Sequence, residues 1–325
     1  MVIEKIKRNS LNLKDMKSVV KLLFVAYAFV SFTASGQDYV FKVLANKGQN
    51  SYKSSQTAWA PLKTGQSLKS GDELKLSKDA YLGLMHNTGK TLEVKTAGTH
   101  TVASLATSLK NKNSSVASKY ADFVINKMTD SGDGGDYRKS LGATGAVDRA
   151  LASNANLKIM AQSSTDIINS EVLIRWNEPK QVGEVEKLTY ELVFSNLFDD
   201  VIKTTETEST SYMLNMEQEP FASLDNKFVK VKVMVKGDEL SSDEYAITTK
   251  PEDESYEIKK TLSELRGEVE ESTALDNIVL AAFYEENSLL LDALTAYERA
   301  IEIAPEVPMY KQAYTDFLIR NNFTK

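Results

Sequence analysis

The sequence contains no cysteine and only two histidines among its 325 residues. Without cysteine the chain can form no disulfide, thiolate zinc site, cysteine nucleophile or iron–sulfur cluster, and it offers no residue for the lipid anchor of a bacterial lipoprotein. The two histidines, His86 and His100, are too few for a histidine-rich metal site and argue against most catalytic triads. A formal charge of −6 argues against broad nucleic-acid binding.

What is present is the composition of a folded chain, with 42% hydrophobic and 26% charged residues. At roughly 100–150 residues per domain, the length predicts two or three domains with real hydrophobic cores.

The first 36 residues have the pattern of a secretory signal peptide. Lys17 and Lys21 precede the apolar run Leu22–Val30, and a small-x-small cleavage pattern closes the segment. The run is short for a membrane span, although a membrane-anchoring helix is the main alternative. Residues 1–15 are interpreted as an over-extended gene start.

Export of a chain without cysteine fits the bacterial periplasm, where dedicated machinery oxidises stray thiols. No later apolar run is long enough to span a bilayer. The predicted location is therefore the periplasm of a Gram-negative bacterium, or its outer membrane through association with another component.

Residues 37–128 are predicted to form a small β domain followed by a helix. Short strands bounded by Gly, Asn or Asp are expected at Tyr39–Leu44, Glu73–Ser77, Tyr81–Met85, Thr91–Lys95 and Thr99–Val102. The helix, within 103–128, shows apolar spacings of three and four and a break near Asn111–Ser115. We expect it to pack on the β unit.

A motif inside this region reads Trp59-Ala60-Pro61-Leu62, then Gly65-x-x-Leu68-x-x-Gly71-Asp72-x-Leu74. It resembles the periplasmic FecR-like domain, whose core is G-x-x-L-x-x-G-D-x-L. We expect both glycines of this core to occupy turns with positive φ and both leucines to point inward. A complete FecR sensor has a cytoplasmic sigma-factor-binding segment and a membrane span before this domain. Here only residues 1–15 precede the signal peptide, so anti-sigma signalling is not expected.

Residues 129–156 are interpreted as a flexible linker. Three carboxylates occur within its glycine-rich part, residues 130–136, but the alternating oxygen ligands and closing glutamate of an EF-hand are missing. We therefore interpret this part as a solvated linker and not as a calcium site.

Residues 157–250 predict an immunoglobulin-like β-sandwich. Trp176 on an early strand and Tyr190 on a later one resemble the fibronectin type III arrangement, in which we expect both rings to be core residues. The expected strands are Leu157–Ala161, Glu171–Asn177, Leu188–Asn196, Val201–Thr207, Ser211–Met216, Phe228–Lys236 and Tyr245–Thr249.

Residues 251–325 predict helices. One apolar stripe begins at Ile258, two helices are expected at about 273–286 and 288–303, and a capping helix is expected from Pro308 to Asn321. Leu280-Ala281-x-x-Tyr284, then Ala293-x-x-x-Tyr297, Ala300 and Pro305, resemble the tetratricopeptide repeat; a plain helical hairpin is the alternative.

One repeat is fewer than the three or so that normally stand alone, so these helices must pack on the rest of the chain or on another protein. Grooves of helical repeats commonly hold peptides or partner helices. The segment Thr273–Asn321 is therefore the predicted partner surface, with Tyr284, Tyr297, Tyr310 and Tyr314 as candidate partner-binding residues.

The search for catalytic motifs finds little. Asn87-Thr88-Gly89-Lys90-Thr91 ends like a phosphate-binding P-loop, but the first glycine of that motif is misplaced and a strand follows where a helix should begin. We interpret it as a hairpin turn. His86 and His100 could face each other across neighbouring strands as half of a metal site, but separate surface positions are commoner.

No catalytic, cofactor-binding or metal-binding residues are predicted. The expected function is a non-catalytic scaffold or adaptor of the cell envelope that binds other envelope proteins. The alternative is a module that binds peptidoglycan or another glycan, with Trp59, Tyr52 and Tyr81 stacking on sugar rings. A hydrolase that uses acidic residues is a third, weaker hypothesis.

Overall fold

The computed structural model describes residues 39–55, 57–109, 116–129, 156–179, 187–224, 227–267, 269 and 272–323. The predicted signal peptide, the predicted helix break and residues 130–155 of the predicted linker lie outside them. Within these ranges, no helix combines the length and apolar character that a membrane crossing requires.

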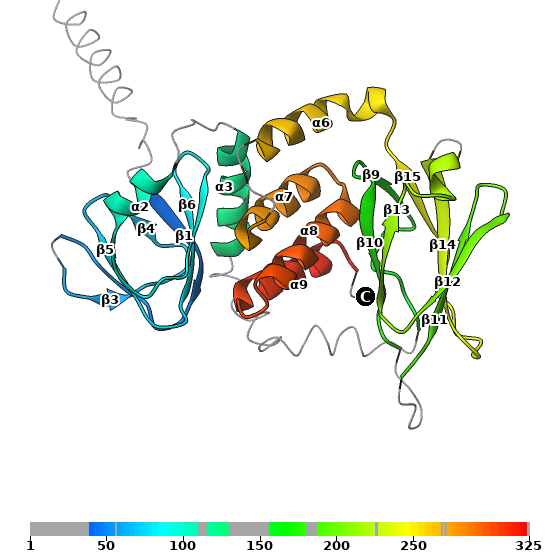
Figure 1. Ribbon diagram of the computed structural model, residues 1–325, viewed down its shortest axis with the longest axis horizontal. Coiled ribbons are helices and arrows are strands. Elements are labelled where there is room, and N and C mark those ends of the chain that lie inside the picture. Colours follow the sequence, from blue (N-terminus) through cyan, green and yellow to red (C-terminus); the bar gives the residue numbers. More distant parts are fainter. Residues whose placement is uncertain are drawn as a thin grey trace, which may run out of the picture. The chain divides into compact units, whose positions relative to one another are not determined.

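The N-terminal part consists of two antiparallel sheets, in the orders β4-β1-β6-β7 and β3-β2-β5-β8 (Figure 1). All five predicted strands are present with ends shifted by a few residues. Three further strands, β2 to β4, are too short to leave a periodic pattern in the sequence. The bounds are β1 (Phe41–Lys47), β2 (Ser51–Lys53), β3 (Ala60–Pro61), β4 (Ser67–Leu68), β5 (Glu73–Leu76), β6 (Tyr81–His86), β7 (Thr91–Val94) and β8 (Gly98–Thr101).

The motif that begins at Trp59 supplies turns and core to these sheets. Leu68 and Leu74 are fully buried, as predicted. Gly65 has φ of 81°, a conformation that favours glycine. The same prediction is wrong for Gly71, which does not have positive φ. There the backbone and carboxylate of Asp72 hydrogen-bond Lys69 and close the turn without a left-handed residue.

The second β region also contains two sheets, which share one hydrophobic core. Five strands follow the order β12-β11-β14-β15-β9, and β10 pairs with β13. Trp176 and Tyr190 are buried in this core with their rings 5.5 Å apart, edge to face, as the sequence predicted. The bounds are β9 (Ser164–Ile167), β10 (Glu171–Arg175), β11 (Tyr190–Ser195), β12 (Val201–Thr207), β13 (Ser211–Asn215), β14 (Phe228–Val235) and β15 (Tyr245–Thr249).

The first strand of this region is not the predicted one. Leu157–Ala161 is not a strand and makes only an isolated bridge, from Ile159 to Trp176. The sheet uses β9 instead, which pairs in parallel with β15. Parallel pairing joins segments far apart in the sequence, so no hairpin signal marks it.

The helices are close to those predicted from the apolar spacing. Among the described residues, two helices follow the first β region and four form the C-terminal region, where α8 lies beside both α7 and α9. Pro308 begins the last helix, at a position where its missing N–H costs nothing. The bounds are α2 (Val102–Ser108), α3 (Val116–Thr129), α6 (Glu252–Arg266), α7 (Ala274–Glu286), α8 (Leu290–Ile303) and α9 (Pro308–Arg320).

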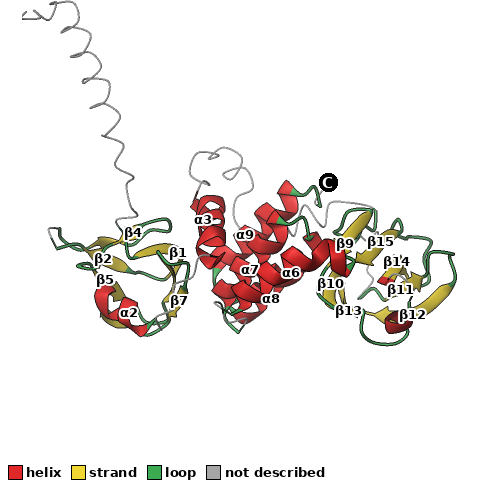
Figure 2. Cartoon of the chain, turned by 90° about the horizontal axis from the view of Figure 1, so that it is seen from above, coloured by secondary structure: helices red, strands yellow, loops and turns green. Residues whose placement is uncertain are grey.

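The C-terminal helices share one core with α3 and with the sheet that contains β1 and β6. Leu44, Tyr81 and Met85 enter this core from the sheet. A Cβ on Gly83 would lie only 3.2 Å from the Ala45 side chain and at an ordinary contact distance of 3.5 Å from Leu275, so the glycine avoids crowding between β6 and β1. Helix α3 packs on β1, as predicted, and also on α7 (Figure 2).

Candidate functional site

The four tyrosines proposed as partner-binding residues are all buried. Tyr297 and Tyr314 pack with Phe317, while Tyr310 packs against Tyr81 of strand β6. Tyr284 packs against its neighbour Phe283. The described fold uses these rings as core, and their contact with a partner stays a prediction.

Helix α8 presents a polar stripe to the second β region. Asp292 accepts hydrogen bonds from the backbone N–H groups of Ile168 and Asn169 at 3.2 and 3.1 Å. One turn later, the Thr295 hydroxyl accepts from the Leu173 N–H of β10 at 2.8 Å. Because residues three apart lie on one helix face, side chains of α8 satisfy backbone donors that β9 and β10 leave open.

Asp292 is 1% exposed and is the most buried carboxylate of this stripe. Burial raises the pKa of Asp292 to about 7, although hydrogen bonds from Asn169 and Ile168 and the nearby charge of Arg266 oppose the rise. Its Oδ1 atom accepts two donors from Asn169, at 3.1 and 2.6 Å, whereas Oδ2 accepts one. Oδ2 is therefore the oxygen better placed to hold a proton.

A pocket of about 270 Å³ opens beside Asp292. Arg266 extends from the end of α6 and donates hydrogen bonds to Asn169 Oδ1 at 3.1 Å and to the Tyr284 hydroxyl at 3.3 Å. The lining combines apolar side chains with two guanidinium groups and several amide and hydroxyl groups. Its residues are Asn169, Ser170, Glu171, Met213, Arg266, Asn277, Leu280, Tyr284, Asp292, Thr295, Ala296 and Arg299.

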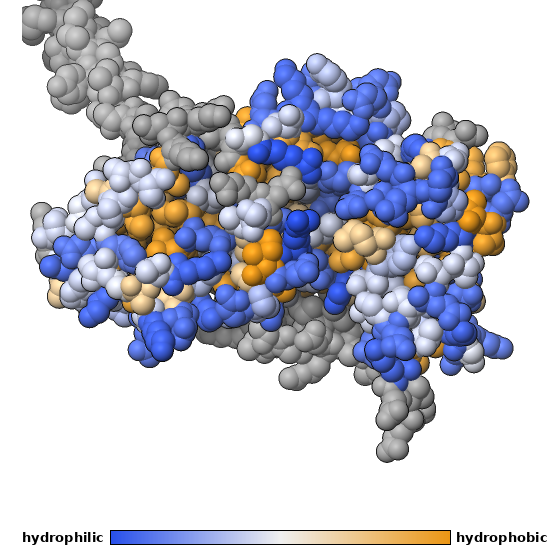
Figure 3. All heavy atoms as spheres, in the orientation of Figure 1, coloured by the Kyte–Doolittle hydropathy of each residue, from blue (hydrophilic) through white to orange (hydrophobic). Residues whose placement is uncertain are grey.

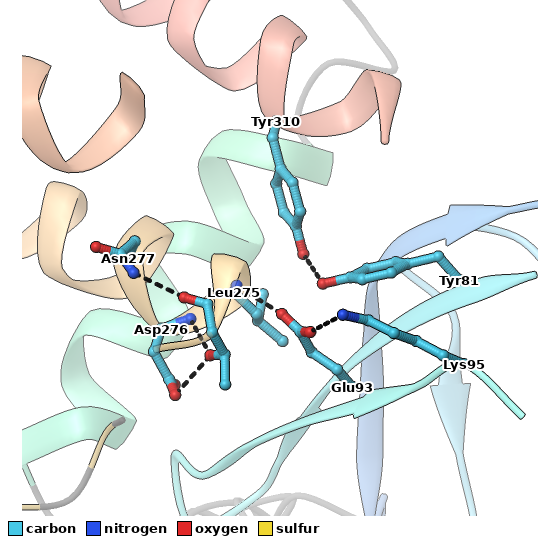
Figure 4. A network of polar contacts seen from close by, with 8 residues as sticks. Tyr81, Glu93, Lys95, Leu275, Asp276, Asn277 and Tyr310 are labelled. Atoms are coloured by element: carbon cyan, nitrogen blue, oxygen red, sulfur yellow. Dashed lines mark hydrogen bonds and ion pairs between the residues drawn. The ribbon is translucent and has the colours of Figure 1, made fainter. Parts of the chain in front are cut away.

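A second polar network joins the helices to the first β region (Figure 4). Glu93 of β7 accepts the Leu275 N–H at the start of α7 at 3.0 Å and pairs with Lys95 at 3.0 Å. Burial alone would raise the pKa of Glu93, but hydrogen bonds from Tyr81, Leu275 and Lys95 hold it below its usual value. A carboxylate at this N–H near the start of α7 also complements the positive end of the helix dipole.

Tyr81 and Tyr310 link their hydroxyls at 2.6 Å in the same network. Either hydroxyl can donate in this pair. The Tyr81 hydroxyl also stabilises the charged form of the Glu93 carboxylate, so Tyr81 serves two partners and Tyr310 serves one.

The different number of partners predicts unequal effects of removing each hydroxyl. We expect Tyr310→Phe to cost about 1 kcal/mol of unfolding free energy, the worth of one hydrogen bond, and Tyr81→Phe about 2 kcal/mol because it leaves two groups without their partner. Urea unfolding of both variants and of the double variant measures the coupling. Tyr256→Phe, at an exposed position on α6, is the control. Equal costs for both variants would contradict the role of Tyr81 as the residue with two partners.

The most exposed apolar side chains lie at the turn between β11 and β12. Leu197, Phe198 and Val201 are 63%, 81% and 63% exposed. Figure 3 shows apolar atoms gathered at the edge of the sheet that carries these strands. We call these three residues the hairpin tip.

The turn that carries the hairpin tip is held by several hydrogen bonds. Asn196 Oδ1 accepts from the N–H groups of Phe198 and Asp200 at 2.9 and 3.0 Å, and its amide donates to the Asp200 carboxylate at 3.0 Å. Asp199 has φ of 68° and forms an ion pair with Lys230 of β14. The turn therefore holds large apolar groups outward, where water contact is unfavourable.

The two histidines and the P-loop-like segment that the sequence analysis considered do not form a site together. His86 is on β6 and His100 on β8, in different sheets, so they do not face each other across neighbouring strands. Residues 87–90 form the predicted turn between antiparallel β6 and β7, with Gly89 at φ of 86°. In the described part of the chain, no three His, Asp or Glu side chains gather in a group that could hold a metal ion.

The aromatics proposed for glycan binding also differ in exposure. Trp59 is 43% exposed, whereas Tyr52 is half-buried and Tyr81 lies in the core. The described fold therefore leaves one of the three rings open for stacking on a sugar.

The chain matches no protein-family model and no curated protein.

The sequence interpretation did not find Asp292, Arg266 or the hairpin tip. Asp292 and Thr295 carried no signal, because they share the polar face of α8 with Arg299 and Glu302 and so match a solvent-facing pattern. For the tip, two adjacent large apolar residues in an Asn-Leu-Phe-Asp-Asp turn were the signal. The pocket had none, since its lining comes from segments far apart in the sequence.

Proposed function

We propose that this protein is a non-catalytic adaptor of the bacterial envelope that binds another protein through its hairpin tip. The supporting observation is the tip itself, where Leu197, Phe198 and Val201 are exposed on a turn braced by Asn196. Exposed apolar groups on a rigid support are typical of protein-interaction sites.

The two polar networks fit an adaptor as well. Thr295 hydrogen-bonds helix α8 to β10, and Glu93 hydrogen-bonds β7 to the start of α7. Both β regions are thus attached to one helical core, and a partner bound at one region would be held by a stiff support. We extend the proposal to a FecR-like fold for the first β region, a fibronectin type III-like fold for the second and a tetratricopeptide-like pair for α7 and α8.

The test is site-specific photo-crosslinking in the native host. A photoreactive phenylalanine analogue at position 198 should give a crosslinked protein, while the same analogue at Tyr256, another exposed aromatic, should not. Adducts at neither position, or equally at both, would contradict the proposal.

A paired substitution tests the same surface without a crosslinker. We expect Leu197→Ser with Phe198→Ser to change the free energy of unfolding by no more than about 0.5 kcal/mol, because both side chains are exposed. The doubly substituted chain should no longer co-purify with the protein that the crosslinking experiment identifies. A large fall in stability would mean that the tip serves the fold and not a partner.

A further inference from the structure

The hairpin tip and the pocket beside Asp292 have complementary chemistry. The tip presents Leu197, Phe198 and Val201 beside the carboxylates of Asp199 and Asp200. The pocket offers the apolar side chains of Met213, Leu280 and Ala296 beside the guanidinium groups of Arg266 and Arg299. The tip is thus apolar and acidic, whereas the pocket is apolar and carries two arginines beside Glu171 and Asp292.

The charges around each surface support the match. Near the tip, Lys230 faces Asp199 and Glu244, and Asp200 adds a further carboxylate. In the pocket, Glu171 opposes the two arginines, while burial favours the neutral form of Asp292. No ion pair to Arg299 occurs in the described ranges, so its charge is available to a carboxylate from outside.

The sizes agree as well. A pocket of about 270 Å³ can take an aromatic side chain but not a folded element. Phe198 is the most exposed of the three tip residues, and burying such a ring removes on the order of 150–250 Å² from water. Because Phe198 is 81% exposed in its own chain, it does not fill the pocket of that chain.

We propose that the hairpin tip of one copy docks in the pocket of a second copy, so that the protein associates head to tail. This rests on the proposed function of the tip as a docking element, and it names a second copy as the partner. Phe198 would lie against Leu280 and Ala296, with Asp200 toward Arg299. A lipid surface fits less well, because anionic head groups would repel the carboxylates of the tip.

The symmetry of such a contact follows from its two different surfaces. A head-to-tail contact leaves one free tip and one free pocket on every open assembly, so further copies can add until a ring closes or an open chain results. A tip in a small pocket buries less than the roughly 1,000 Å² of a stable interface, so the association is weak and depends on concentration.

The experiment is sedimentation velocity of the full chain over a concentration series. The wild-type average mass should rise with concentration, and Phe198→Ser or Arg299→Glu should each weaken association at least tenfold. Lys311→Glu, a charge reversal on exposed α9, is the matched control and should associate like wild type. Circular dichroism checks that each variant is folded.

Mixing the variants separates this geometry from others. The Phe198→Ser chain keeps a working pocket and the Arg299→Glu chain keeps a working tip, so an equal mixture should form a one-to-one complex and stop there. Pairing Asp200→Arg with Arg299→Glu in one chain should recover part of the wild-type association. The recovery tests the proposed contact between these two positions.

Three results would overturn the proposal: a monomeric wild type at every concentration, association unchanged in both single variants, or no complex in the mixture. If the wild type is monomeric while position 198 still crosslinks a different protein in the envelope, the proposed adaptor function stands and only the second copy is excluded. If position 198 crosslinks nothing and the chain is monomeric, both proposals fail.

Discussion

Replacing Asp292 with alanine should lower the free energy of unfolding by about 3 kcal/mol. The substitution leaves the backbone N–H groups of Ile168 and Asn169 without their acceptor, and a buried donor without a partner costs about 1–3 kcal/mol. Urea unfolding followed by the fluorescence of Trp176 measures the loss, because this residue directly follows β10 and is buried. Trp59→Phe removes the other tryptophan signal.

The pH dependence gives this prediction a second, independent readout. Because the pKa of Asp292 is raised from 3.8 to about 7 in the fold, the folded chain holds a proton that the unfolded chain releases above pH 4. The contribution of Asp292 to stability is thus fully present below about pH 4 and falls as the pH rises to about 7. At roughly 1.4 kcal/mol per pKa unit, the fall amounts to a few kcal/mol.

Asp292→Asn separates the charge from the hydrogen bonds. The amide can still accept from Asn169 but cannot ionise, so we expect a smaller loss at neutral pH and no contribution from this position to the slope between pH 4 and 7. Glu302→Gln, at an exposed position on the same helix, should change neither quantity. An Asp292→Asn chain that keeps the full wild-type slope would show that another group titrates there.

The elements of this fold could be predicted more readily than their contacts. Strand β14 alternates half-buried and buried residues along its whole length. It begins at the predicted residue and ends one residue before the predicted end. The helices α7 and α8 followed from apolar spacing in the same way. These patterns are local, because each depends on one period of the backbone.

What could not be predicted is which faces meet. Apart from Asp276 and Asn277, helix α7 carries apolar or aromatic residues from Ala274 to Tyr284. This indicates a helix covered on every side but not by which element. The sequence interpretation left two alternatives for this cover, the rest of the chain or another protein, and the structure shows α3, α8 and β7 of the same chain. The pocket and the Asp292 contact depend on that packing, so no local pattern marks them as a site.

Removing residues 251–325 should therefore unfold much of the remaining chain. The deletion exposes Leu44, Tyr81 and Met85 of the first β region. At about 1.5–3 kcal/mol for each large apolar side chain, this removes roughly 5 kcal/mol or more, a large part of the stability of a typical domain. The second β region also loses the side chains of Asp292 and Thr295, which accept hydrogen bonds from its backbone N–H groups.

Two measurements on the truncated chain check this, the binding of a hydrophobic dye and unfolding in urea. We expect strong dye fluorescence, and no cooperative transition at the urea concentration where the full chain unfolds. Co-expression of 251–325 as a separate chain is the control, since it restores the missing contacts and should reduce dye binding. A truncated chain with a native spectrum and a cooperative transition would contradict the shared core. If the prediction holds, a truncated chain that no longer binds its partner has lost binding because it is unfolded. Substitutions at Leu197 and Phe198, which leave the fold intact, then test the binding surface itself.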